Sequence, residues 1–262
     1  MLAEITPLLL TFDEAPNIGR VLEKLSWARE IVIVDSFSTD QTCEIARQFP
    51  NTRLFQREFD SHASQWNYGL RETGISTRWV LALDADFVLP DASIREIASL
   101  VPGPEVSGYR TSFTYCVGGK PLRGAAYPPL VVLFQREKAQ YFQDGHTQRL
   151  RLEAGEVRNL REPLLHDDRK SLGRWLRSQH RYMRLESAKL ASSRFSDLRF
   201  QDKIRRLGFV APPAMLFYCL FAKGNILDGR AGLTYALQRM VAESLLSYYL
   251  LRALFAPKRS TT

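Results

Sequence analysis

The 262-residue sequence predicts an α/β fold: a Rossmann-like, mostly parallel sheet with helices on both faces, followed by a C-terminal helical extension. Apolar strand-like runs alternate with helix-like segments through the first hundred residues, which is typical of parallel sheets. Thr11, Asp35 and Asp84 each end one of these runs. From Ser171 onward the chain is basic and helix-like. We therefore expect an α/β domain over residues 1–168 and a basic helical extension over 169–262.

Each element of the first domain follows from its local pattern. Apolar runs predict strands, and helices lie between them, one of them beginning near an early proline. Strands are expected at 5–11, 31–35, 52–55 and 78–83, and helices at 16–26, 39–49, 61–71 and 91–100. After Pro102-Gly103-Pro104 the pattern changes, and strands are expected at 108–117, 130–134 and 148–152. Ligands on such sheets bind beyond the carboxyl ends of the strands.

Composition limits where this protein acts and what it binds. With 45% hydrophobic residues, the chain can bury a full core. Its three cysteines are far apart, which indicates free thiols in a reducing compartment. The first residues lack a basic segment and fit a strand better than a signal peptide, so a cytoplasmic location is expected.

Charge is unevenly distributed along the chain. Residues 1–148 contain 14 Lys and Arg against 18 Asp and Glu, whereas residues 149–206 contain 16 against 8. The remaining residues contain 6 against 2. A cationic second half favours anionic partners such as a phosphorylated substrate, anionic lipid or nucleic acid.

The Asp84-Ala85-Asp86 stretch is the strongest indication of chemistry. It follows the buried run Trp79-Val80-Leu81-Ala82-Leu83 and places two carboxylates at the carboxyl end of a strand. Carboxylate oxygens suit Mg²⁺ or Mn²⁺, which take their other ligands from water and substrate phosphates. The pair could hold a metal against the diphosphate of a nucleotide-sugar. An acidic turn without a metal is the alternative.

Two other strand ends carry candidate binding groups. Thr11-Phe12-Asp13-Glu14 could stack on a base through Phe12 and hydrogen-bond it through Thr11 or Glu14. Asp35 could accept hydrogen bonds from a base or ribose. Asp40, further along, is expected to be a helix N-cap. The alternatives are an ordinary loop at Thr11–Glu14 and a capping role for both acidic residues.

The second half offers two further candidates. Asp144-Gly145-His146-Thr147 lies between strand-like runs, and Asp144 and His146 could each deprotonate an acceptor hydroxyl. An Asp-Gly pair is otherwise a common hairpin turn. His166-Asp167-Asp168 could supply a third metal ligand through His166, or could be a polar surface loop.

Together these motifs resemble the family 2 glycosyltransferases, which have the GT-A fold. Thr11 to Ile18 (TFDEAPNI) is similar to that family's opening motif, and Ile31 to Thr42 (IVIVDSFSTDQT) to its second-strand signature. Gln65-Trp66-Asn67 matches a Gln-(Lys/Arg)-Asn element except at Trp66, and Trp79 to Asp86 (WVLALDAD) matches the metal-binding strand. The resemblance is strong over residues 1–90 and is nearest to bacterial enzymes of lipopolysaccharide-core and exopolysaccharide synthesis.

The resemblance implies a metal-dependent, inverting transfer from a nucleotide-sugar, most often a UDP-sugar, to a hydroxyl of a lipid-linked or lipopolysaccharide-core saccharide. The implied ligands of Mg²⁺ or Mn²⁺ are Asp86, His166 and Asp84, and Asp144 or His146 is the implied base. The residues expected to contact the donor are Thr11, Phe12, Glu14, Asp35, Gln65, Asn67 and Asp84. Phe87 stands where related enzymes often have Glu, and Gly145-His146-Thr147-Gln148 replaces their His-Glu element.

The C-terminal apolar segments suggest a membrane surface as a partner. Residues 207–222 are apolar but interrupted by Pro212-Pro213, and residues 233–255 are interrupted by charged groups. Neither segment provides the uninterrupted run of roughly 20 apolar residues that a spanning helix needs. Basic flanks favour helices lying on the anionic inner face of the cell membrane. Packing on the domain, homodimerisation and a hairpin through the bilayer are the alternatives.

Two other functions compete with glycosyl transfer. A nucleotidyltransferase also combines an α/β sheet with metal-binding Asp residues, but Thr11 to Arg20 is not the glycine-rich, basic loop that it usually needs. A nucleic-acid-binding protein could use the basic stretch 149–206, where Trp175 and Tyr182 interleave with Lys and Arg. That function leaves the Asp pair unexplained, so nucleic acid is not expected as a partner.

Overall fold

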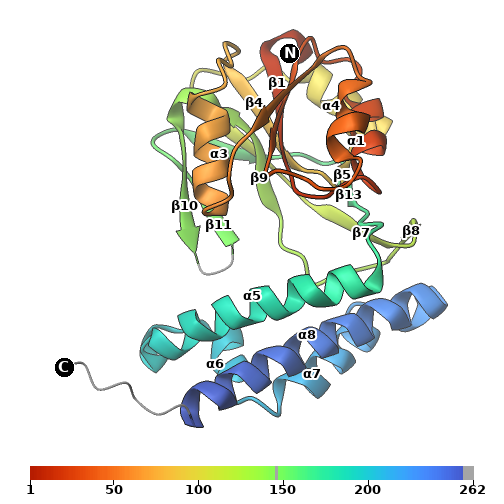
Figure 1. Ribbon diagram of the computed structural model, residues 1–262, viewed down its shortest axis with the longest axis vertical. Helices are drawn as coiled ribbons and strands as arrows, with labels where there is room; N and C mark the ends of the chain where they lie inside the picture. The colour runs from red at the N-terminus through yellow and green to blue at the C-terminus, as the bar shows by residue number, and fades with distance from the viewer. Residues whose placement is uncertain (145–146, 256–262) are drawn as a thin grey trace. The chain divides into compact units, whose positions relative to one another are not determined.

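A seven-stranded sheet organises the N-terminal part of the computed structural model, which describes residues 1–144 and 147–255 (Figure 1). Its strand order is β12-β6-β9-β4-β1-β2-β3. The bounds are β1 Ile5–Thr11, β2 Ile31–Asp35, β3 Thr52–Gln56, β4 Trp79–Asp84, β6 Val106–Thr111, β9 Leu130–Gln135 and β12 Glu156–Asn159. Strand β1 lies between β2 and β4 and is parallel to both, and β9 is antiparallel to its neighbours. The predicted α/β fold class is confirmed.

The register of the central strands aligns their polar ends. Thr11 pairs with Asp35 on β2, and Leu10 pairs with Asp84 on β4. The strand order also reverses at β1, because β2 and β3 extend to one side while β4 lies on the other. Such a reversal opens a crevice beyond the carboxyl ends of the strands. Thr11, Asp35 and Asp84 therefore lie at the edge where ligands bind in sheets of this kind.

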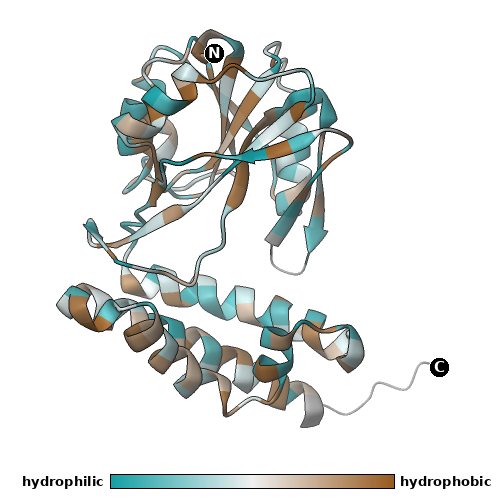
Figure 2. Cartoon of the chain, turned by 180° about the vertical axis from the view of Figure 1, so that it is seen from behind, coloured by the Kyte–Doolittle hydropathy of each residue, from teal (hydrophilic) through white to brown (hydrophobic). Residues whose placement is uncertain are grey.

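Helices cover both faces of the sheet because successive strand residues point to opposite sides. Leu9, Ile33 and Leu83 share one core with α1 and α4, and Leu8, Val32 and Val80 share the other with α3 (Figure 1). The helices are α1 Ile18–Lys24, α2 Thr42–Arg47, α3 His62–Arg71 and α4 Asp91–Ser99. The central strands are accordingly the most hydrophobic part of the sheet in Figure 2.

Two helices are shorter than the sequence predicted. Helix α1 spans seven residues instead of 16–26, and α2 begins at Thr42 with Gln41 at its N-cap, so the expectation that Asp40 is the cap was wrong. Asp40 instead accepts a hydrogen bond from the Thr42 amide, two residues further on. This is the local bonding by which an Asp forms a turn ahead of a helix. Ser61 does cap α3 by accepting from the Ser64 amide.

A smaller sheet and a hairpin complete the first compact unit, which consists of residues 1–121 and 127–170. The small sheet has the order β5-β13-β7-β8, and β10 and β11 form the hairpin. Their bounds are β5 Phe87–Val88, β7 Phe113–Val117, β8 Lys120–Pro121, β10 Ala139–Asp144, β11 Thr147–Leu152 and β13 Leu164–His166. The sequence predicted β11 and a single strand over β6 and β7, and missed β5, β8, β10, β12 and β13.

The second compact unit contains residues 122–126 and the chain from Ser171 onward. Its helices are α5 Leu172–Ser192, α6 Phe200–Arg206, α7 Ala211–Phe217 and α8 Gly229–Phe255, with a π-helical turn at Tyr218–Ala222 after α7. Met183 and Leu190 of α5 pack on Leu246 and Leu250 of α8. Arg205 joins the helices by pairing with Glu186 at 3.3 Å and Glu243 at 3.1 Å.

The short segment 122–126 is held by α8 and the turn before it. The Arg123 amide donates to Asp228 Oδ2 at 3.0 Å, and the Ala126 amide donates to the Tyr235 hydroxyl at 2.8 Å. Within residues 1–144 and 147–255, none of the helices combines the length and the apolar character that crossing a bilayer requires.

Candidate active site

Asp35 is the most tightly bound side chain at the carboxyl edge of the sheet. Its carboxylate is fully buried and accepts hydrogen bonds from Thr11 Oγ1 at 2.8 Å and from the Ser38 amide at 2.8 Å. Burial by itself raises the pKa of Asp35, but the hydrogen bonds from Ser38 and Thr11 outweigh it and the net pKa is lowered. Asp35 is therefore a fixed anion that couples the ends of β1 and β2.

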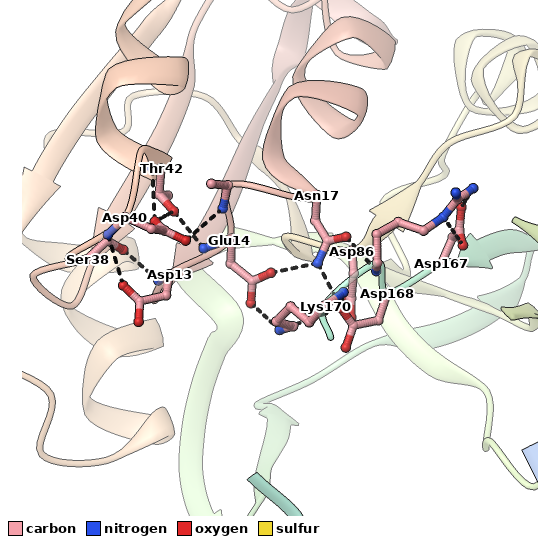
Figure 3. Close-up of polar contacts among 12 residues, drawn as sticks. Asp13, Glu14, Asn17, Ser38, Asp40, Thr42, Asp86, Asp167, Asp168 and Lys170 are labelled. Atoms are coloured by element: carbon pink, nitrogen blue, oxygen red, sulfur yellow. Dashed lines mark hydrogen bonds and ion pairs between the residues drawn. The ribbon is translucent and has the colours of Figure 1, made fainter. Parts of the chain in front are cut away.

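The loops after β1 and β2 are bonded to each other through Asp13. Its amide donates to Ser38 Oγ at 2.7 Å, and its carboxylate accepts from the Thr39 amide at 2.7 Å (Figure 3). Asp13 and Phe37 both have positive φ angles, 53° and 56°, which non-glycine residues seldom adopt. Phe12 and Phe37 each leave about half of the side chain exposed (49%). Sequence reasoning found Phe12 and missed Phe37.

Asp86 and His166 come together although they are 80 residues apart. Strand β13 pairs with β5 so that His166 lies opposite Phe87, and the Asp167 amide donates to the Asp86 carbonyl at 3.0 Å. His166 Nε2 then lies 3.3 Å from Asp86 Oδ2, and both side chains are 13% exposed. Burial lowers the pKa of His166, but attraction to the Asp86 carboxylate outweighs it and the net pKa is raised. Strand pairing thus brings together Asp86 and His166, which are far apart in the sequence.

Three aromatic rings fix the His166 imidazole. The ring centroids of Tyr115 and Tyr127 lie 4.6 Å from that of His166, and that of Phe87 lies 5.1 Å away. Phe87 replaces the Glu expected from the resemblance and here serves as a wall of this box. Within the part of the chain that the structure describes, the buried Nδ1 of His166 has no hydrogen-bond partner. Tyr115 and Tyr127 were not predicted, because no local pattern connects them to His166.

The donor set fits a hard divalent ion that is shared with a substrate. Asp86 and His166 offer an oxygen and a nitrogen ligand, and Mg²⁺ or Mn²⁺ commonly takes one or two protein ligands and completes its shell with phosphates and water. Over residues 1–144 and 147–255, no group of three or more His, Cys, Asp or Glu side chains is close enough to hold a metal. The expected trio of Asp84, Asp86 and His166 is therefore not gathered as a three-ligand site.

Asp84 lies beside this pair as the last residue of β4. Burial and then repulsion by the Asp86 carboxylate raise the pKa of Asp84 to about 6. For Asp86, burial raises the pKa, but attraction to His166 outweighs it and the net pKa is lowered. The two carboxylates thus differ, because Asp84 takes up a proton at a higher pH than Asp86 does.

Residues 167–170 are clamped onto the start of α1. Asn17 donates through Nδ2 to Asp168 Oδ1 at 2.9 Å and accepts from the Arg169 amide at 2.8 Å. Arg20 donates to Asp167 Oδ2 at 2.7 Å and to the Asp167 carbonyl at 2.8 Å. These bonds fix the segment that follows His166 and so help to aim the imidazole at Asp86.

Lys170 brings a cation into this acidic site. Its Nζ lies 2.6 Å from Glu14 Oε1 and 3.9 Å from Asp168 Oδ1, and Asn17 donates to the other oxygen of Glu14 at 2.8 Å (Figure 3). Burial raises the pKa of Glu14 to about 7, with Asp86 adding to the rise and Lys170 opposing it. Sequence reasoning missed Lys170; the available signal was its position four residues after the candidate ligand His166.

The amides of Gln65 and Asn67 are engaged within the protein. Gln65 Oε1 accepts from Arg57 at 2.6 Å, and its Nε2 donates to Ser36 Oγ at 2.8 Å. Asn67 donates to the Tyr141 carbonyl at 2.8 Å and accepts from the Tyr141 amide at 2.9 Å. Asn67 therefore ties α3 to β10. Contact of either side chain with a donor remains a prediction.

Asp144, one of the two candidate bases, lies at the end of β10. Asp144 closes β10 opposite Thr147 on β11, and its carboxylate forms an ion pair with Arg149. Its side chain is 22% exposed. His146 lies outside the described residues.

Comparison with known proteins identifies the family. The sequence profile of Glycosyl transferase family 2 matches residues 8–152, more than half of the chain. A curated relative, the lipopolysaccharide core biosynthesis glycosyltransferase LpsC of Rhizobium meliloti (strain 1021), is 28% identical over 114 residues. That alignment spans 41% of this chain and 41% of the relative.

Solved structures share the fold. The mannosyltransferase PcManGT from Pyrobaculum calidifontis, solved in complex with GDP-Man and Mn²⁺, aligns with a TM-score of 0.52 and 18% identity, covering 96% of this chain and 86% of that one. A mycobacterial protein aligns with a TM-score of 0.50 and 17% identity, covering 71% and 73%. With the profile match, these likenesses lead to one conclusion: the chain belongs to glycosyl transferase family 2 and has the GT-A fold.

Proposed function

We propose that this protein is a metal-dependent, inverting glycosyltransferase. It would move a sugar from a nucleotide-sugar to a hydroxyl of a lipid-linked or lipopolysaccharide-core saccharide, and UDP-sugars are the first donors to test. The observation that carries the proposal is the largely buried Asp86–His166 pair, with 3.3 Å between Oδ2 and Nε2, at the carboxyl edge of the sheet. Family membership favours glycosyl transfer over nucleotidyl transfer and over nucleic-acid binding.

Asp86 and His166, with Asp84 beside them, would hold Mg²⁺ or Mn²⁺. When bound, the ion neutralises charge on the departing diphosphate. The structure of PcManGT with GDP-Man and Mn²⁺ supports this choice of ion and of donor class. The aromatic box would keep the imidazole in one orientation, and its low polarity would strengthen electrostatic interactions in the site.

Lys170 would add a permanent positive charge for the donor's phosphates. Its ammonium pairs with Glu14 and Asp168, and the donor's phosphate oxygens would be further anionic partners for it. Thr11 and Asp35 would position the nucleoside, Phe12 would stack on the base, and Glu14, Gln65 and Asn67 would support these contacts. Because Glu14 is paired with Lys170, it would act on the donor through that lysine and not by direct contact.

Asp144 would deprotonate the acceptor hydroxyl, and His146 is the alternative. A carboxylate serves as a general base when it lies within hydrogen-bond reach of the attacking group. The acceptor class is supported by the lipopolysaccharide-core relative LpsC, and inversion is the outcome implied by the family 2 resemblance. A lipid-linked acceptor would place the enzyme at the inner face of the cell membrane, as a monomer or a homodimer.

The direct test is a panel of nucleotide-sugars with Mn²⁺, Mg²⁺ or EDTA. Thermal unfolding and slow hydrolysis of each donor are measured together. We expect one donor to raise the melting temperature and to be hydrolysed only when a divalent ion is present. Metal-independent hydrolysis of that donor, or protection by no donor at all, would contradict the proposal.

A further inference from the structure

The second compact unit exposes an unusually apolar surface. In residues 207–227, seven large apolar residues are between 52% and 75% exposed: Leu207, Phe209, Val210, Phe217, Phe221, Ile226 and Leu227. We refer to these seven residues as the apolar surface. Isolated exposed apolar residues are ordinary, but so many within 21 residues indicate a surface that is covered when the protein works.

Local structure directs these side chains outward. Ala211 and Cys219 are buried, and α7 packs against α8 on that side. Phe217 and Phe221 are one helical turn apart on the exposed side, and their rings stack with centroids 5.9 Å apart. The helical segment from Ala211 to Ala222 therefore has one side committed to the protein and one side rich in exposed aromatic rings.

Basic residues outnumber acidic ones in the sequence that flanks the apolar surface. Lys223 is the one charged residue of the sequence between 207 and 227. Its Nζ lies 5.4 Å from the ring centroid of Tyr218, which is itself exposed. Lys203 and Arg206 precede the surface and Arg230 follows it. The nearest acidic residue after it, Asp228, is buried and paired with Arg123 at 3.4 Å.

We propose that the apolar surface inserts into an anionic lipid leaflet. Exposed aromatic and aliphatic side chains with basic flanks are the composition of helices that lie in the membrane interface. The absence of a spanning helix within the described ranges 1–144 and 147–255 agrees with a surface that enters one leaflet only. Lys223, Lys203 and Arg230 then face lipid phosphates, which attract them electrostatically.

Charge favours lipid over a second copy of this chain. Pairing two such surfaces would bring two sets of cationic flanks together, whereas an anionic leaflet neutralises one set. The inference does not depend on the donor or the metal, since lipid binding is measured without either. Only its consequence, access to a lipid-linked acceptor, rests on the proposed function.

The test is sedimentation of the full chain with phosphatidylcholine vesicles that do or do not contain phosphatidylglycerol. The wild-type protein should sediment with the anionic vesicles, and higher salt should weaken this binding. The variant Phe217→Gln/Phe221→Gln should bind at least about tenfold more weakly, because it loses two exposed aromatic side chains that would insert into the leaflet. Lys223→Glu should weaken binding to anionic vesicles more than binding to neutral ones.

The matched control is Val101→Gln/Leu172→Gln, which also removes two exposed apolar side chains but lies outside the apolar surface. It should bind vesicles like the wild type, and circular dichroism should show that all variants are folded. Equal vesicle binding by the wild type and the Phe217/Phe221 variant would overturn the proposal. So would a wild-type dimer in light scattering that binds no vesicles and becomes a monomer in that variant, because the surface would then join two copies.

Discussion

Lys170 Nζ lies 2.6 Å from Glu14 Oε1, so a residue after β13 is paired with a residue after β1, 156 positions earlier in the chain. Burial lowers the pKa of Lys170, but attraction to Glu14, Asp168 and Asp86 outweighs it and the net pKa is raised. The ammonium is therefore charged at every physiological pH. It is the group that offsets the carboxylates of this site before any ligand arrives.

Replacing Lys170 with Met should weaken nucleotide binding more in EDTA than in Mn²⁺. A Lys⁺–phosphate hydrogen bond contributes about 1.5–3 kcal/mol, so we expect a loss of at least about tenfold in affinity without metal. Isothermal titration calorimetry with the nucleotide of the preferred donor measures both conditions. Lys24→Met removes an exposed lysine that pairs with Asp91 and should leave affinity unchanged. If Lys170→Met and the wild type bind the nucleotide with equal affinity in EDTA, the Lys170–Glu14 pair has only a structural role.

The sequence predicts the front of the fold well because its strands are continuous apolar runs. Ile31 to Val34 and Trp79 to Leu83 are buried on both faces, so their composition alone marks them as central parallel strands. The alignment of Thr11, Asp35 and Asp84 follows from that topology, since parallel strands end at one edge. For the same reason, the sequence also predicted which edge of the sheet carries the residues expected to bind the donor.

The missed elements depend on contacts distant in sequence. Strand β13 has only three residues, and β12 has four exposed ones, so neither carries a periodic signal. Their pairing with β7, β5 and β6 creates them. The aromatic box around His166 and the Lys170–Glu14 pair depend on that pairing too. The local sequence pointed to His166 as a candidate ligand, but it could not predict the aromatic rings around it, which come from distant parts of the chain.

Asp86→Asn should remove the metal-linked stabilisation. A ligand present at a hundred times its Kd adds about 2.7 kcal/mol to the free energy of unfolding, and the variant should lose the part of that gain that needs Mn²⁺. Thermal unfolding with and without Mn²⁺ and donor measures it, and electron paramagnetic resonance of free Mn²⁺ reports binding without turnover. Asp91→Asn, an exposed Asp elsewhere, is the control. Undiminished Mn²⁺ binding by Asp86→Asn would exclude Asp86 as a ligand.

Asp35→Asn should destabilise the fold by about 1–3 kcal/mol at pH 7, because an amide N–H₂ would face the Ser38 and Thr11 donors. The folded-state pKa of Asp35 is lowered, so its stabilisation is present above the unfolded value of about 3.9 and disappears as pH falls through the folded value. The difference in unfolding free energy between wild type and variant should therefore shrink below about pH 4.

Urea unfolding at several pH values measures this difference. Thr11→Val is the matched control, because it removes one donor to Asp35 and keeps the carboxylate, so acid should still reduce its stability. A wild-type to Asp35→Asn gap that stays constant down to pH 3 would contradict the assignment.

Asn67→Ala should lower the stability of the fold more than it lowers the affinity for the donor. The variant loses two hydrogen bonds to the Tyr141 backbone, which should cost about 1–3 kcal/mol of unfolding free energy. Because those bonds join α3 to β10, hydrogen exchange should rise in the β10–β11 hairpin first. Urea unfolding and calorimetry with the donor separate the two effects. Unchanged stability with weakened donor binding would make Asn67 a donor contact.

Asp144→Asn should lose transfer while keeping donor affinity. A positioned general base contributes about 10²–10⁴-fold to a rate, and the neutral amide cannot accept the hydroxyl proton. Transfer to a water-soluble acceptor and calorimetry with the donor give the two quantities. Glu153→Gln removes an exposed carboxylate just after β11 and should keep full activity. If Asp144→Asn transfers normally and His146→Ala does not, the base is His146, and the Asp144–Arg149 pair serves to fix the hairpin.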